Sequence, residues 1–116
     1  MSKFIGKLDV ECLGDRLYIL TRSLTYFSDI AKQAIIVPVG FKTDLLSTWT
    51  IPFAAELFDG DDPEPAALHD YTYSSHMFTR AMSDAILREA CIAVGTSKLR
   101  AWAIWIGVRI GGGSHW

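Results

Sequence analysis

The chain is organised around the stretch AALHDYTY (residues 66–73) and the segment RAMSD (residues 80–84) that follows it. His69 and Tyr73 are four residues apart, and so are Arg80 and Asp84, so each pair shares one face of a helix. If the two helices fold back on each other, His69 meets Asp84. A carboxylate that orients an imidazole is the minimum that a general base requires.

The composition is that of one globular domain. The chain has 116 residues, of which half are hydrophobic and 21% are charged, and this length suffices to bury a core. The net charge is −2 and no basic stripe occurs, so no nucleic-acid partner is expected. The longest apolar run, residues 101–108, is far shorter than the roughly 20 residues that span a bilayer. We therefore expect a single domain over residues 1–116, with no secretion signal and no transmembrane segment.

Cysteine usage points to a reducing compartment. Cys12 and Cys91 are far apart in the sequence, and two cysteines make neither a disulfide framework nor a zinc site. We expect both to be free, buried thiols.

The first third of the chain reads as β-structure. Alternating apolar and polar residues predict a strand at residues 4–12, and residues 16–21 and 24–28 are rich in types that suit a pleated surface. These last two segments are expected to form a hairpin through residues 22–23. Residues 34–37 predict one more strand. Residues 38–44 have two interpretations of about equal weight: a turn that leaves the sheet, or a loop that brings Asp44 to the site.

The second half of the chain reads as helices. A short helix is expected at residues 53–58. Asp62 suits the N-cap of a helix that runs to about Ser75, Thr79 suits the cap of a second helix to Val94, and Thr96 or Ser97 caps a third helix to about Ile110. Strands followed by helices indicate an α+β fold: a small antiparallel β meander in the N-terminal third, followed by about three packed helices on one of its faces.

His69 allows a functional and a structural interpretation, and on this residue alone we weight them equally. A buried His–Asp pair that only fixes helix packing would leave the same sequence pattern. The accumulation of polar groups favours function, because Tyr73 can donate to Asp84 and Arg80 adds a positive charge beside it. His76 and His115 have less support, since no zinc-binding spacing surrounds them.

Several motifs together resemble an uncharacterised phage and prophage family, the domain of unknown function 1353. The chain carries, in order, Val37-Pro38-x-Gly40-Phe41-x-Thr43-Asp44, Ala67-x-His69-Asp70-x-x-Tyr73, Arg80-x-x-x-Asp84 and Val108-Arg109-x-x-Gly112. It departs from the family at residues 45–49, where Leu-Ala-Ser followed by an apolar residue and proline is more usual. The resemblance implies a phage-encoded protein, located in the virion or in the host cytoplasm, and brings no established activity.

The pattern His69-Asp70-x-x-Tyr73, with Asp84 on a neighbouring helix, also looks like the helix pair of phospholipases A2. That similarity implies that His69 is the base, that Asp84 orients it, and that Tyr73 is bonded to Asp84. It also implies that Asp70 is a ligand of a calcium ion. Calcium takes six to eight oxygens, and the candidate for supplying more is the loop that ends at Asp44.

Two functional hypotheses follow. The first is a hydrolase with a His69–Asp84 site, supported by Tyr73 and Arg80 and with or without a metal, that acts on a phospholipid or peptidoglycan bond of the cell envelope. The second is a virion or tail component in which the polar cluster is only structural, and in which the Trp-rich last helix contacts other virion proteins or a second copy of the chain. A small inhibitor of host defence is a third, weaker hypothesis.

Overall fold

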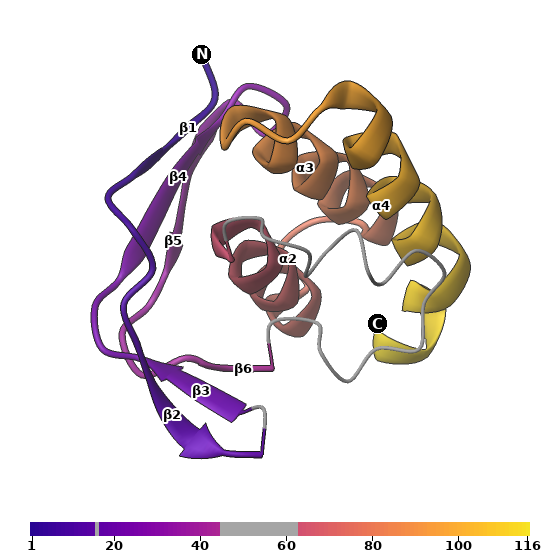
Figure 1. Cartoon of the computed structure of the whole chain (residues 1–116). Helices are drawn as coiled ribbons and strands as arrows, with labels where there is room; N and C mark the ends of the chain where they lie inside the picture. Colours follow the sequence, from indigo (N-terminus) through magenta and orange to yellow (C-terminus); the bar gives the residue numbers. More distant parts are fainter. Residues whose placement is uncertain (16, 45–62) are drawn as a thin grey trace.

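The computed structural model describes residues 1–15, 17–44 and 63–116, and in these residues strands precede helices as predicted for an α+β fold (Figure 1). The predicted helix at residues 53–58 and the predicted N-cap Asp62 lie outside the described residues. The strands are β1 (Lys3–Ile5), β2 (Val10–Gly14), β3 (Leu17–Leu20), β4 (Leu24–Ser28), β5 (Gln33–Val37) and β6 (Lys42–Thr43). The helices are α2 (Glu64–Ser75), α3 (Arg80–Ala93) and α4 (Lys98–Gly111), followed by the short 3-10 helix η1 (Gly112–His115).

The strands form two antiparallel sheets of three strands, in the orders β1-β4-β5 and β2-β3-β6. The predicted single strand at residues 4–12 was wrong, because β1 and β2 belong to different sheets. Gly6 lies between them with a φ of 76°, a backbone conformation that glycine adopts at little cost. The chain therefore leaves the first sheet at Gly6 and enters the second at β2.

The predicted hairpin between residues 16–21 and 24–28 was also wrong in its pairing. Both strands exist, but β3 pairs with β2 and β6, whereas β4 pairs with β1 and β5. Residues 22–23 carry the chain from one sheet to the other, and they lack the Asn-Gly type of turn that closes a two-residue hairpin. Positive φ values instead mark a turn at the end of β2, at Gly14 and Asp15, and a turn at Lys32, just before β5.

Residues 38–44 lead from β5 of the first sheet into β6 of the second sheet. One of the two interpretations of this segment was a turn that leaves the sheet. After a turn, β6 pairs with β3 in the register Tyr18↔Thr43. This strand also contacts α2, and the ring of Phe41 meets that of Tyr71 edge-on at 5.2 Å. The segment before Asp44 is thus fixed between the second sheet and the helix that carries His69.

The helices lie on one side of the sheets, with α2 beside the strands and α4 packed on the outside of α3 (Figure 1). One apolar core joins the strands to α2 and α3 and includes Tyr26, Ile35, Leu68 and Ile86. A second core joins the three helices and includes Leu87 and Ile104. The α2–α3 pair is therefore held on both sides by buried apolar residues.

The two cysteines differ in their surroundings. Cys91 is not in a disulfide bond and is buried in the helical core, as predicted. Cys12 is free but exposed, so its predicted burial was wrong. It lies on β2, an edge strand whose side chains are mostly open to solvent. None of the described helices is long and apolar enough to cross a membrane.

The cap of α3 gives a first prediction. The Thr79 hydroxyl accepts a hydrogen bond from the Met82 backbone N–H at 3.2 Å. Thr79→Ala should therefore lower the free energy of unfolding by about 1 kcal/mol, measured by urea denaturation. Thr96→Ala is the matched control, because Ser97 and not Thr96 caps α4. Equal losses in the two variants would contradict the capping role.

Candidate functional site

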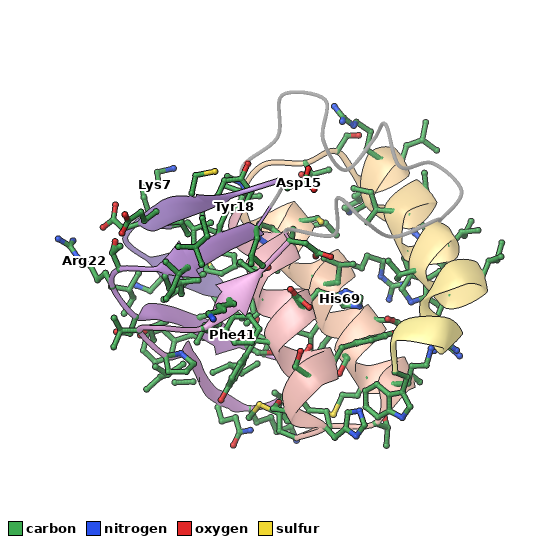
Figure 2. All side chains as sticks on the ribbon, turned by 90° about the horizontal axis from the view of Figure 1, so that it is seen from below. Lys7, Asp15, Tyr18, Arg22, Phe41 and His69 are labelled. Carbon is green, nitrogen blue, oxygen red and sulfur yellow. The ribbon has the colours of Figure 1, made fainter. Side chains whose placement is uncertain are left out.

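The structure brings His69 of α2 and Asp84 of α3 into direct contact. His69 Nε2 lies 2.8 Å from Asp84 Oδ1, and both side chains are fully buried. Figure 2 shows His69 in the interior among the helices, whereas Lys7 and Arg22 point away from the body of the molecule. The short link between the two helices, residues 76–79, lets them fold back on each other. The contact expected from the spacing of these residues is therefore present.

Both oxygens of the Asp84 carboxylate accept hydrogen bonds. Tyr73 donates its hydroxyl to Oδ1 at 2.6 Å, and Arg109 of α4 donates from its guanidinium to Oδ2 at 2.8 Å. Burial tends to raise the pKa of Asp84, but the hydrogen bonds from His69, Tyr73 and Arg109 outweigh burial and hold this pKa below its usual value. Asp84 is thus an ionised carboxylate at neutral pH.

Burial determines the charge of the His69 ring, and Asp84 determines which of its two nitrogens carries the proton. Burial lowers the pKa of His69, and the attraction of Asp84 opposes this only in part. The imidazole is therefore neutral at neutral pH. Because an ionised carboxylate only accepts hydrogen bonds, Nε2 carries the proton and Nδ1 carries the lone pair. This arrangement makes Nδ1 the basic atom of the ring.

Arg80 acts on the network through its neighbours. Its guanidinium donates to the Tyr73 hydroxyl at 3.1 Å and to the backbone carbonyls of Val108 and Arg109 at 3.0 and 2.7 Å. It thereby fixes Tyr73 and joins the last turn of α4 to the start of α3. Arg80 was expected beside Asp84, but it reaches the carboxylate only through the Tyr73 hydroxyl. The guanidinium that contacts Asp84 directly belongs to Arg109.

Two residues of the site had no predicted role. Arg109 lies in a motif that carries the family resemblance, and its charge directly after the apolar run at residues 101–108 is the feature that could have identified it. Trp116 lies beyond η1, and its ring meets Tyr73 edge-on at 5.1 Å and stacks on His76 at 4.1 Å. The sequence gives no indication of where this tail goes. His76 itself ends α2 in a left-handed conformation with a φ of 52°.

The predicted calcium ligands do not form a complete site in the part of the chain that is described. Asp70 follows His69 on α2, and Asp44 follows β6; both are half-buried. Among the described residues, no group of three or more His, Cys, Asp or Glu side chains could hold a metal ion. Calcium requires six to eight oxygens, so these residues alone do not fit it, and calcium binding stays a prediction.

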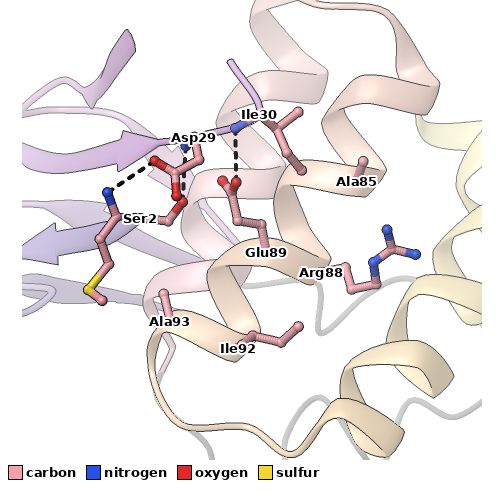
Figure 3. Close-up of a pocket in the computed structure, with 9 residues that line it drawn as sticks. Ser2, Asp29, Ile30, Ala85, Arg88, Glu89, Ile92 and Ala93 are labelled. Carbon is pink, nitrogen blue, oxygen red and sulfur yellow. Dashed lines mark hydrogen bonds and ion pairs between the residues drawn. The ribbon is translucent and has the colours of Figure 1, made fainter. Parts of the chain in front are cut away.

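A cavity of about 540 Å³ lies elsewhere, between the N-terminal segment, the β4–β5 turn and α3 (Figure 3). On its wall Glu89 accepts hydrogen bonds from the Tyr26 and Ser28 hydroxyls and from the Ile30 backbone N–H. These hydrogen bonds attach the β4–β5 turn to α3. His69, Asp84, Tyr73 and Arg109 do not line this cavity, so it is separate from the buried network.

Comparison with known proteins identifies a family. A family model described as "Protein of unknown function (DUF1353)" matches residues 18–108. These residues include the strands from β3 onward and nearly all of the three helices, with His69, Tyr73, Arg80 and Asp84 inside the matched range. No curated protein and no solved structure matches the chain.

Proposed function

Because this chain belongs to the DUF1353 family of proteins of unknown function, we propose its activity from the buried network alone: a hydrolase in which His69 and Asp84 are the reactive pair. The observation that supports the proposal is that the Asp84 carboxylate accepts hydrogen bonds from His69, Tyr73 and Arg109. It keeps Asp84 ionised and leaves the lone pair of His69 on Nδ1. A neutral imidazole oriented by a carboxylate is suited to general-base catalysis.

In the proposed reaction on an ester, Nδ1 of His69 takes a proton from a water molecule as that water attacks the carbonyl carbon. The bond from that carbon to the leaving alcohol then breaks, and the imidazolium returns its proton to the leaving oxygen. The imidazolium that forms is stabilised by Asp84, which stays ionised. Tyr73 and Arg109 hold Asp84 in place, and Arg80 holds Tyr73. Arg80 is therefore a positioning residue, whereas His69 is the catalytic base.

The proposed substrate is a component of the cell envelope, with a phospholipid ester first and a peptidoglycan bond second. The similarity of His69-Asp70-x-x-Tyr73 to phospholipases A2 supports the first choice, and the phage resemblance of the family motifs supports an envelope target. Because His69 is fully buried, turnover requires a conformational opening that exposes the ring. Such openings of loops and lids commonly set the rate of an enzyme.

The test is hydrolysis of phospholipid vesicles and of peptidoglycan by the full chain, with and without added calcium. His69→Gln should lower the rate by about 10²–10⁴-fold, because the amide can still donate to Asp84 but cannot accept the proton. His76→Gln is the matched control, since His76 is exposed and lies outside the hydrogen-bonded network, and it should keep the wild-type rate. Equal rates in wild type and His69→Gln would refute the proposal.

A second candidate function is a structural component of a phage virion or tail, and the full burial of the His69–Asp84 pair favours it. In that case the network only fixes the packing of α2, α3 and α4. The wild-type chain would then hydrolyse none of these substrates, and His69→Ala would cost about 1–3 kcal/mol of stability by leaving buried partners unpaired.

A further inference from the structure

The solvent-facing side of α4 is apolar. Leu99, Trp102, Ile106 and Ile110 are spaced by three and four residues, so they form a single row along the helix, here called the α4 stripe. Their exposed fractions are 82%, 49%, 38% and 68%. The opposite side of α4, with Ala101, Ile104 and Val108, already packs in the helical core. The α4 stripe is therefore not needed to attach the helix to the fold.

The aromatic part of this surface is held in a fixed arrangement. The Arg88 guanidinium of α3 lies over the ring of Trp102 at 4.7 Å and over that of Trp105 at 5.2 Å. The two indoles meet edge-on at 5.1 Å. Indole rings combine a large apolar area with one N–H donor, which suits them to the boundary between hydrocarbon and water.

Among the described residues of α3 and α4, the charges beside the α4 stripe are positive. Helix α4 contains lysine and arginine but no aspartate or glutamate, and Lys98 at its start is exposed. Both carboxylates of the neighbouring α3 are engaged elsewhere: Asp84 is buried against Arg109, and Glu89 binds the β4–β5 turn. A second copy of the chain would bring another set of the same cations to the stripe, with no carboxylate from α4 to pair with them.

We propose that the α4 stripe, with Lys98 and Arg88 at its edge, binds the surface of membranes that contain anionic phospholipids. The stripe runs for about 17 Å along the helix, too short to cross a bilayer core of about 30 Å. The helix therefore lies in the plane of the interface, with its apolar side chains among the lipids and its cations at the headgroups. This inference rests on the surface of α4 and not on the proposed hydrolysis.

The test is co-flotation of the full chain with vesicles of phosphatidylcholine alone or of phosphatidylcholine mixed with phosphatidylglycerol. The chain should bind the mixed vesicles at low salt and less at high salt. A double variant, Leu99→Gln with Ile110→Gln, should weaken this binding at least about tenfold, because it removes the two most exposed side chains of the stripe. The matched control is Ile36→Gln with Val39→Gln, which removes exposed apolar residues from the sheet side and should bind as wild type does.

A charge variant tests the cationic edge separately. Lys98→Glu should lower binding to the mixed vesicles and flatten its dependence on salt. Circular dichroism and the unfolding midpoint establish that each variant is folded. Equal binding to both kinds of vesicle, or no binding to either, would overturn the proposal. A concentration-dependent dimer that the Leu99/Ile110 variant abolishes would overturn it in favour of a second copy.

Discussion

Asp84→Ala is expected to lower the free energy of unfolding by about 3–5 kcal/mol, the cost of breaking a buried charge network by removing one partner. The loss is large because a single carboxylate accepts hydrogen bonds from His69, Tyr73 and Arg109. Without it, the buried His69 and Tyr73 lose the carboxylate that accepts their hydrogen bonds, and the partly exposed Arg109 loses its ion pair. Urea denaturation of the wild type and the variant measures the difference.

Two further substitutions make this result specific. Asp84→Asn keeps the shape of the side chain but turns one acceptor into a donor, so it should recover only part of the loss. Asp29→Ala removes a carboxylate whose ion pair with the N-terminal amine is largely exposed, and it should cost far less stability than Asp84→Ala because solvent screens such pairs. A loss for Asp84→Ala as small as that for Asp29→Ala would mean that the network adds little to stability.

Acidification is expected to destabilise the fold, beginning below about pH 6.5, the ordinary pKa of histidine. Burial lowers the pKa of His69 in the folded state, so below this pH the unfolded chain binds one proton more than the folded chain. The free energy of unfolding should then fall by up to about 1.4 kcal/mol per pH unit. The pKa of Asp84 is also lowered, so a second loss should begin below about pH 4.

The contribution of His69 can be isolated by substitution. His69→Gln removes the titrating ring, so its stability should depend less on pH between about pH 6.5 and 5 than that of the wild type. His76→Gln should retain the wild-type dependence. A wild-type stability that rises on acidification in this window would contradict the assignment, because it would mean that folding favours the charged imidazolium beside Asp84.

The helices could be predicted from the sequence because their determinants are local. Thr79 caps α3 as expected, and Gly95, with a φ of 97°, follows its end. The partners of the strands could not be predicted in this way. The strands β3, β4 and β5 were recognisable from their composition, whereas β1 and β2 were predicted as one strand and β6 was not predicted as a strand. The pairing of β1 with β4 joins residues twenty or more positions apart. Local patterns do not encode such a choice, because it depends on which faces the helices later cover.

The same distinction applies to the candidate site. His69, Tyr73 and Asp84 could be placed together because two short spacings and one helix hairpin relate them. Arg109 reaches the site from the third helix, α4, and Trp116 from beyond it, 25 residues or more after Asp84. Their contacts depend on how α4 packs on α3, and a single sequence does not state that packing. The family match ends at residue 108, one residue before Arg109, so it contains neither Arg109 nor Trp116.

The pairing of β1 with β4 also determines how the chain folds. The β4–β5 hairpin closes through a short turn, and the helix pair forms from neighbouring residues. Strand β1 (Lys3–Ile5), in contrast, can pair with Thr25–Phe27 of β4 only after the segment that contains β2 and β3 has brought the two strands together. Closing that long loop costs entropy before any contact repays it. We therefore expect the helical hairpin to gain protection from hydrogen exchange early in refolding, and the first strand to be among the last to acquire it.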